Sequence, residues 1–271
     1  MNDLTPILLS PSKSPLPFVK TWLFEESLFM WDVMDWMLAQ EAVGAVPEGH
    51  VLFGVLEDPG QASSTAGHAI EKNRLHAPRD ASDLPPDLRG LLEAESLQPG
   101  RDGETEIVGL THPDEWPICA FMFEQYLARA KAGEWRGAHW WSEDEDEPPI
   151  VAGREPEGWD LPPDRNLTVS LVPVATGRDA IAAYPQGYWG MQPIDNYVMA
   201  GVLADALGYE LKGFGATYAG FARPSPLTAG EAATLESLFV LPGAEAQPAK
   251  PGHIARIAEG QRTLFLKYMW A

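Results

Sequence analysis

Cysteine is almost absent from this sequence. Cys119 is the single cysteine among 271 residues, so neither an intrachain disulfide nor a cysteine-based zinc site can form. Cys119 lies in the stretch "WPICAFMFEQYL", whose apolar residues recur at helical spacing. This pattern predicts a buried structural thiol rather than a nucleophile.

Long apolar runs and common catalytic motifs are missing as well. No segment approaches the ~18 uninterrupted apolar residues of a membrane span, and the first ten residues lack the features of an export signal. The chain has no Walker sequence, no HExxH motif and no GxSxG motif. The sequence therefore predicts no catalytic residues, no cofactor and no metal ligands, and favours a cytoplasmic protein that does not bind membranes.

Basic residues are scarce relative to acidic ones. Nineteen Lys and Arg stand against 39 Asp and Glu, which gives a net charge of −20. A field of that sign repels phosphate backbones and attracts basic proteins. We therefore expect no nucleic-acid partner and favour a basic protein partner, bound by a monomer or weak dimer. The alternative interpretation, that the charge serves solubility, stays open.

The acidic residues are densest in the stretch "HWWSEDEDEPP", where two tryptophans precede five consecutive acids. A calcium loop needs a glycine between its oxygen ligands, and this run has none. A solvated loop is the common fate of such a run, but tryptophans beside acids also suit a surface that holds Arg or Lys side chains. The predicted partner-binding residues are Trp140, Trp141, Glu143, Asp144, Glu145, Asp146 and Glu147.

The pattern along the chain predicts an α+β fold with a mixed or antiparallel sheet and packed helices, divided into two subdomains. The predicted regions are 1–138, an acidic proline-rich linker or loop at 139–165, and 166–271. Helices are expected at 16–43, 86–96, 115–133, 193–208 and 228–243. Strands are expected at 50–58, 104–110, 166–174, 209–224 and 261–270. The rest of 58–105 is rich in Gly, Pro and Ser and predicts loop.

The turn "GYWGMQP", residues 187–193, is a second candidate ligand site. Its aromatic residues lie between glycines, and Pro193 suits the first turn of the helix that follows. Two interpretations stay open: the aromatics pack over the sheet edge, or they face a ligand together with nearby polar groups. The candidate ligand residues are Tyr188, Trp189, Gln192, Asp195 and Asn196.

Residues 167–271 resemble the bacterial "domain of unknown function 4253" family. That family carries a Gly-Gly-Trp-Asn-x-Cys-Pro turn, a helix, a Tyr-Gly-Ala corner, a strand ending in Arg-Pro-Pro and an aromatic C-terminus. The matching residues are Gly187, Trp189, Pro193, Gly208, Arg223, Pro224 and Trp270, while Gly190, Gln192 and Tyr209 depart from the pattern. The resemblance implies a bacterial protein and brings no activity with it.

These features favour a non-catalytic bacterial binding protein that neutralises a basic protein partner, such as an immunity protein against a toxin. Two alternatives stay open. One is a hydrolase or metal-dependent enzyme with its site in the C-terminal half. The other is a phage-associated or structural protein.

Overall fold

The computed structural model describes residues 4–10, 13–14, 19–75, 81–93, 97–99, 105–107, 116–131, 150–152, 164–186, 192–239 and 251–267. In this part of the chain, eight strands form one sheet in the spatial order β1-β2-β7-β3-β8-β9-β10-β6. Their bounds are β1 Ile7–Leu8, β2 Lys20–Phe24, β7 Leu167–Val172, β3 Val51–Val55, β8 Glu210–Phe214, β9 Tyr218–Ala222, β10 Thr263–Lys267 and β6 Ile150–Ala152. Strands β4 Leu97–Pro99 and β5 Thr105–Ile107 pair separately.

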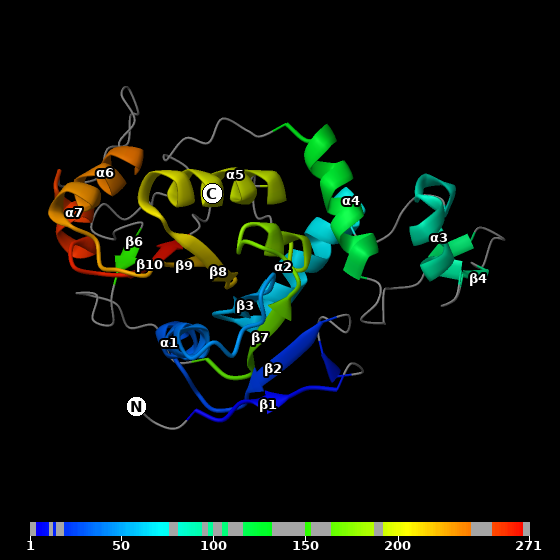
Figure 1. Ribbon diagram of the computed structural model, residues 1–271, viewed down its shortest axis with the longest axis horizontal. Coiled ribbons are helices and arrows are strands. Elements are labelled where there is room, and N and C mark those ends of the chain that lie inside the picture. Colours follow the sequence, from blue (N-terminus) through cyan, green and yellow to red (C-terminus); the bar gives the residue numbers. More distant parts are fainter. Residues whose placement is uncertain are drawn as a thin grey trace.

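Helices cover both faces of the large sheet (Figure 1). Helix α1, Met30–Ala42, lies on one face, and its buried residues pack in one cluster with Leu52, Leu167 and Phe265. The opposite face packs against the remaining large helices through a second cluster. Those helices are α2 Pro59–Asn73, α4 Trp116–Arg129, α5 Pro193–Leu207, α6 Ala229–Phe239 and α7 His253–Ala258, with α3 Pro86–Glu93 beside them. Strands buried on both faces alternate between these two clusters, as period-two geometry requires.

The strands at the centre of the sheet determine where a site can form. Strand β3 pairs antiparallel with β7 but parallel with β8. Gly54 and Gly213 face each other in this parallel pair, and a Cβ on Gly213 would lie 2.1 Å from the Gly54 carbonyl oxygen. The two glycines therefore permit the close approach of β3 and β8. Because parallel strands end at the same edge, residues after Val55 and after Phe214 meet there.

The mixed sheet with packed helices confirms the predicted α+β fold class. The predicted helices at 86–96, 115–133, 193–208 and 228–243 contain α3, α4, α5 and α6, and the predicted strands contain β3, β5, β7, the hairpin β8–β9 and β10. Cys119 is fully buried, as predicted. Strand β7, from the region after residue 165, lies between β2 and β3, which come from the region before residue 139. The predicted division into 1–138, 139–165 and 166–271 stays a prediction.

Two predicted segments are wrong. A single helix over 16–43 is replaced by strand β2 and helix α1, because Lys20–Phe24 pairs along its whole length with β7. This long-range pairing outweighs the local helical spacing of the apolar residues. The loop predicted after residue 58 contains helix α2, which begins with Asp58 as its N-cap and Pro59 in its first turn. Asp-Pro-Gly is a turn signal, but the same residues suit a helix start.

Among the described residues, no helix is both long and apolar enough to cross a membrane.

Candidate functional site

The predicted site residues fall into two groups. Trp140, Trp141, Glu143, Asp144, Glu145, Asp146 and Glu147, together with Tyr188 and Trp189, lie outside the described residues. Gln192, Asp195 and Asn196 lie at the start of α5. The Asp195 carboxylate accepts a hydrogen bond from the Gln192 backbone N–H at 2.8 Å, which caps the helix. Fully buried Asn196 donates to the Gln186 carbonyl at 2.7 Å and so ties α5 to the preceding segment.

A pocket of about 270 Å³ opens where the chain leaves β3. We call it the acidic pocket; it is lined by Leu28, Phe29, Met30, Trp31, Leu56, Glu57, Asp58 and Asp164. It lies between the start of α1 on one face of the sheet and the start of α2 on the other. The site thus combines three carboxylates with two aromatic side chains at the carboxyl end of a central strand.

Glu57 is held against the loop that follows β8. Its two carboxylate oxygens accept hydrogen bonds from Thr217, one from the backbone N–H at 2.9 Å and one from the hydroxyl at 2.7 Å. Gly215 leaves the room for this contact, because a Cβ at that position would lie 2.3 Å from a Glu57 oxygen. The parallel β3–β8 pair therefore fixes the orientation of Glu57.

Asp58 and Asp164 are joined across 106 positions in the chain. The Asp58 backbone N–H donates to the Asp164 carboxylate at 2.7 Å, while the Asp58 carboxylate caps α2 by accepting from the Gln61 N–H at 3.1 Å. Asp164 is in turn held by two backbone hydrogen bonds to Leu28, each 2.8 Å long. Each carboxylate uses one oxygen in these contacts, so its second oxygen can accept from a ligand.

Asp58 also has an uncommon backbone conformation. Its φ is +37°, in the left-handed region that only Gly, Asn and Asp adopt with any ease. Strained residues persist where the surrounding structure over-determines them and occur often at functional sites. An aspartate here supplies both the cap and a charge, whereas a glycine would supply neither.

The carboxylates of the acidic pocket bring negative charges close together. Burial raises the pKa of the Glu57 carboxyl above its usual range, and the negative charges of Asp164 and Asp58 add to the rise, against the lowering effect of the Thr217 hydrogen bonds. Within the described residues, the ion pairs join Lys212 to Glu41 and Glu210, and Arg223 to Glu231. None of these three ion pairs reaches the pocket, so no cation of the described residues is seen to pair with its carboxylates.

The aromatic wall of the pocket is preformed. The rings of Phe29 and Trp31 stack with their centroids 4.7 Å apart and their planes 13° from parallel, and both side chains are half-buried. A cation that approaches such a wall gains from the ring quadrupole as well as from nearby carboxylates. The volume is below the ~300–1,000 Å³ of small-molecule pockets, and suits one Arg or Lys head group.

The described residues contain no group of His, Cys, Asp and Glu side chains arranged to hold a metal ion. The three carboxylates are already oriented by hydrogen bonds to backbone and hydroxyl donors. Recognition of an organic cation is the chemistry that these described residues support.

Sequence reasoning missed this pocket for a definable reason. The letters "EDP" at 57–59 follow a strand and precede a cap-and-proline helix start, which is a readable signal. Asp164 gives no such signal, because its place beside Asp58 depends on strand pairing between distant segments.

No protein-family model, no curated protein and no solved structure matches this chain. The resemblance of residues 167–271 to the domain of unknown function 4253 family therefore stays a prediction.

Proposed function

We propose that this protein is a non-catalytic binding protein that neutralises a basic protein partner, and that an Arg or Lys side chain of the partner enters the acidic pocket. The observation that carries the proposal is that Glu57, Asp58 and Asp164 line one pocket beside the stacked Phe29–Trp31 wall. The net charge of −20 supports it, because such a field steers basic proteins toward the surface.

The biological setting that we propose is a bacterial immunity protein that binds a basic toxin in the cytoplasm. A neutralising protein needs fast association, and charge steering supplies it. It also needs slow dissociation, and an aromatic anchor point supplies that. The run Trp140–Glu147 has the same two ingredients in sequence, so we propose it as a second part of the same interface.

The test begins with capture of basic proteins from the native host at low salt, followed by kinetics on the captured partner. The variant is the double replacement Asp58→Asn and Asp164→Asn. An asparagine at position 58 tolerates the left-handed backbone and still caps α2. An asparagine at position 164 still accepts a hydrogen bond from the backbone N–H of residue 58, so the fold should be retained. We expect the association rate at low ionic strength to fall by roughly tenfold, within the range that steering supplies.

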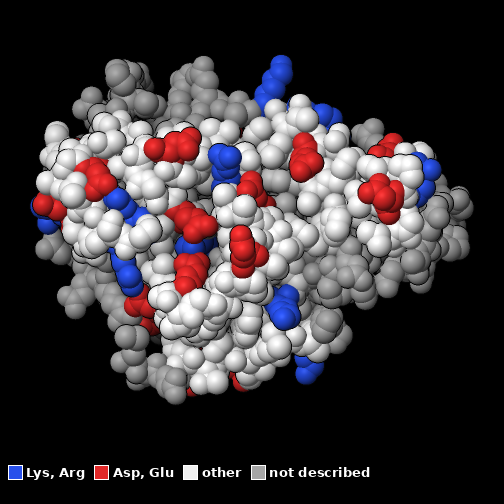
Figure 2. Space-filling view, viewed as in Figure 1, with Lys and Arg blue, Asp and Glu red and all other residues white. Residues whose placement is uncertain are grey.

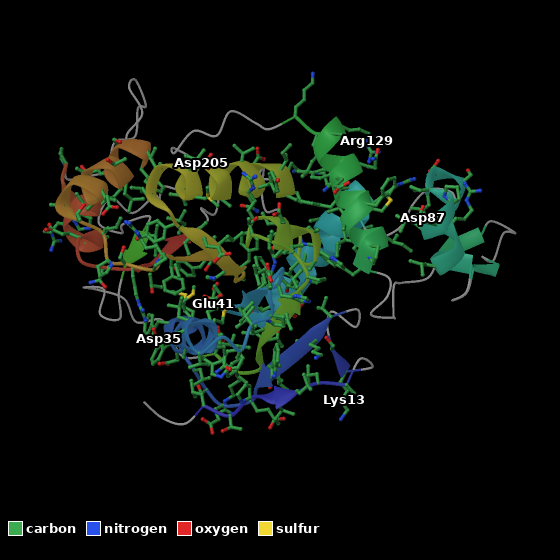
Figure 3. All side chains as sticks on the ribbon, viewed as in Figure 1. Lys13, Asp35, Glu41, Asp87, Arg129 and Asp205 are labelled. Atoms are coloured by element: carbon green, nitrogen blue, oxygen red, sulfur yellow. The ribbon has the colours of Figure 1, made fainter. Side chains whose placement is uncertain are left out.

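The matched control is Asp205→Asn on α5, an exposed aspartate away from the pocket (Figure 3). It removes a charge of the same kind, so it should change the rate far less. Trp31→Ala should instead raise the dissociation rate, because it removes an anchor that acts after the complex forms. Capture of no basic protein, or a double variant that binds at the parental rate, would overturn the proposal.

A further inference from the structure

A second and larger cavity opens at the other end of α2. Its volume is about 610 Å³, and we call it the basic cavity; it is lined by Lys72, Asn73, Arg74, Asp83, Phe121, Met122, Gln125 and Arg129. Three lining residues come from the end of α2, and four come from α4, which lies beside α2 in Figure 1. This volume falls in the ~300–1,000 Å³ range of small-molecule sites.

The charge of the basic cavity is opposite to that of the protein. The chain has about two acidic residues for each basic one, and cations and anions intermingle on the face shown in Figure 2. The cavity reverses this ratio, with Lys72, Arg74 and Arg129 against the single acid Asp83. The ion pairs of the described residues include none of these three cations.

Helix ends account for part of this arrangement. Lys72 and Arg129 lie in the last turns of α2 and α4, where a cation is stabilised by the helix dipole. The dipole favours a cation at Arg74 as well, but it does not account for the backbone conformation of this residue. This residue is the C-cap of α2 with φ +53°, the left-handed position that glycine ordinarily occupies. This residue therefore combines a strained backbone with a place on the wall of a cavity, and strained residues occur often at functional sites.

The apolar side chains of the basic cavity and one of its two amides lie on α4. Phe121, Gln125 and Arg129 are spaced four residues apart, so they share one face of the helix. Phe121 is half-buried and Met122 is buried. The cavity therefore offers an aromatic surface at one position and guanidinium donors at another.

We propose that the basic cavity binds a small organic phosphate, with the phosphate held by Arg74, Arg129 and Lys72 and the organic part against Phe121. Guanidinium groups bind phosphate oxygens in a bidentate manner. The lining cations exceed the acid by two charges, which matches the charge of about −1.5 to −2 on a phosphate monoester at neutral pH. The site is independent of the acidic pocket and of the proposed partner.

The net charge of −20 repels such a ligand at long range. Affinity therefore has to come from contacts inside the cavity, where charge-assisted hydrogen bonds act at short distance. Lys72, Arg74 and Arg129 are solvent-exposed, so the alternative is a diffuse attraction of anions to the surface, in which exposed cations elsewhere would contribute equally.

The experiment is calorimetric titration of the full chain with adenosine monophosphate, adenosine and inorganic phosphate. We expect adenosine monophosphate to bind about tenfold or more tightly than phosphate, and adenosine not to bind in the same concentration range. The first variant is Arg74→Gly, which removes the guanidinium and places the favoured residue at a left-handed C-cap. Its melting temperature should stay equal or rise, while affinity falls about tenfold or more, as loss of a charge-assisted contact does.

Lys72→Gln is a second variant in case Arg74→Gly perturbs the end of α2, and it should also weaken binding. The control is Lys13→Gln, an exposed cation that lies far from Arg129 in Figure 3, and it should leave the affinity unchanged. The proposal is overturned if adenosine monophosphate does not bind the parent protein. It is also overturned if adenosine binds equally well, or if both cavity variants bind like the parent.

Discussion

The two ends of helix α2 carry opposite sites. At its start, Asp58 lines a pocket of about 270 Å³ with two further carboxylates; at its end, Arg74 lines a cavity of about 610 Å³ with two further cations. Both end residues are non-glycine residues with positive φ, at +37° and +53°. The charges agree in sign with the helix dipole, but the cavities differ in size. The small one suits a side chain of a partner, and the large one suits a whole ligand.

The two sites should act independently although one helix links them. The 15 residues of α2 span about 22 Å at 1.5 Å per residue, and charges are screened over about 8 Å at physiological salt. Mutations that far apart usually add within about 0.5 kcal/mol. Each end can therefore be changed without changing the electrostatics of the other.

The largest effect should come from the shared scaffold. Gly213→Ala would place a Cβ 2.1 Å from the backbone of Gly54, and a backbone atom yields less than a flexible side chain. We expect the free energy of unfolding to fall by about 3 kcal/mol, at the upper end for an overpacked site. Chemical denaturation measures it. Gly67→Ala, on α2 with open space around its Cβ, is the control and should be neutral or stabilising.

Replacement of the two end residues of α2 should give effects of opposite sign. Asp58→Ala removes an N-cap and places alanine at positive φ, so we expect a loss of about 1–2 kcal/mol. Arg74→Gly relieves a left-handed backbone and should gain up to about 1 kcal/mol. Thermal or denaturant unfolding of both variants and of their combination decides this. A double variant that departs from the sum by more than about 0.5 kcal/mol would show that the ends are coupled.

The sequence predicted the helices and strands that have strong local patterns. Helix α5 has Pro193 in its first turn and Gly208 at its C-cap, and α6 begins with Thr228 and Glu231, which exchange the two hydrogen bonds of a capping box. Helix α2 was missed because its buried residues are small, and an Ala and Thr stripe gives a weak periodic signal. Strand β2 was missed because its pairing partner lies far along the chain.

The candidate site could be predicted only in part. A search for basic-partner surfaces follows from the net charge, and the acidic run at 143–147 is its clearest local signal. The acidic pocket depends on Asp58 and Asp164 meeting across the fold, and no local pattern encodes this contact. No sequence pattern singles out Arg74 either, because the feature that distinguishes this residue is its positive φ.

Glu57→Gln should sharpen the description of the acidic pocket. Glutamine can accept the Thr217 N–H and donate to the Thr217 hydroxyl, so the local structure should persist. The pKa of Glu57 is raised in the folded protein above 4.5, chiefly by burial, so the charged form opposes folding at neutral pH. We expect the variant to be more stable than the parent at pH 7 and the difference to shrink as pH falls toward 4.5. If the free energy of unfolding of the parent and of Glu57→Gln depended on pH in the same way, this prediction would be wrong.

The smallest effect concerns a carboxyl outside both cavities, shifted in the opposite direction. The hydrogen bond from Arg223, 2.6 Å from Glu231, lowers the pKa of Glu231 from 4.5 to about 2, with help from Thr228. A lowered pKa means that this carboxylate stabilises the fold above pH 4.5 and that the contribution is lost between about 4.5 and 2. Glu231→Gln should therefore weaken the protein slightly at neutral pH and converge with the parent near pH 2, since the carboxylate is solvent-exposed and screened. Acid titration of parent, Glu231→Gln and Glu57→Gln together gives the comparison. Glu231→Gln should lose stability at neutral pH and Glu57→Gln should gain it. Pairing with a cation lowers the pKa of a carboxyl, whereas burial without a cation raises it.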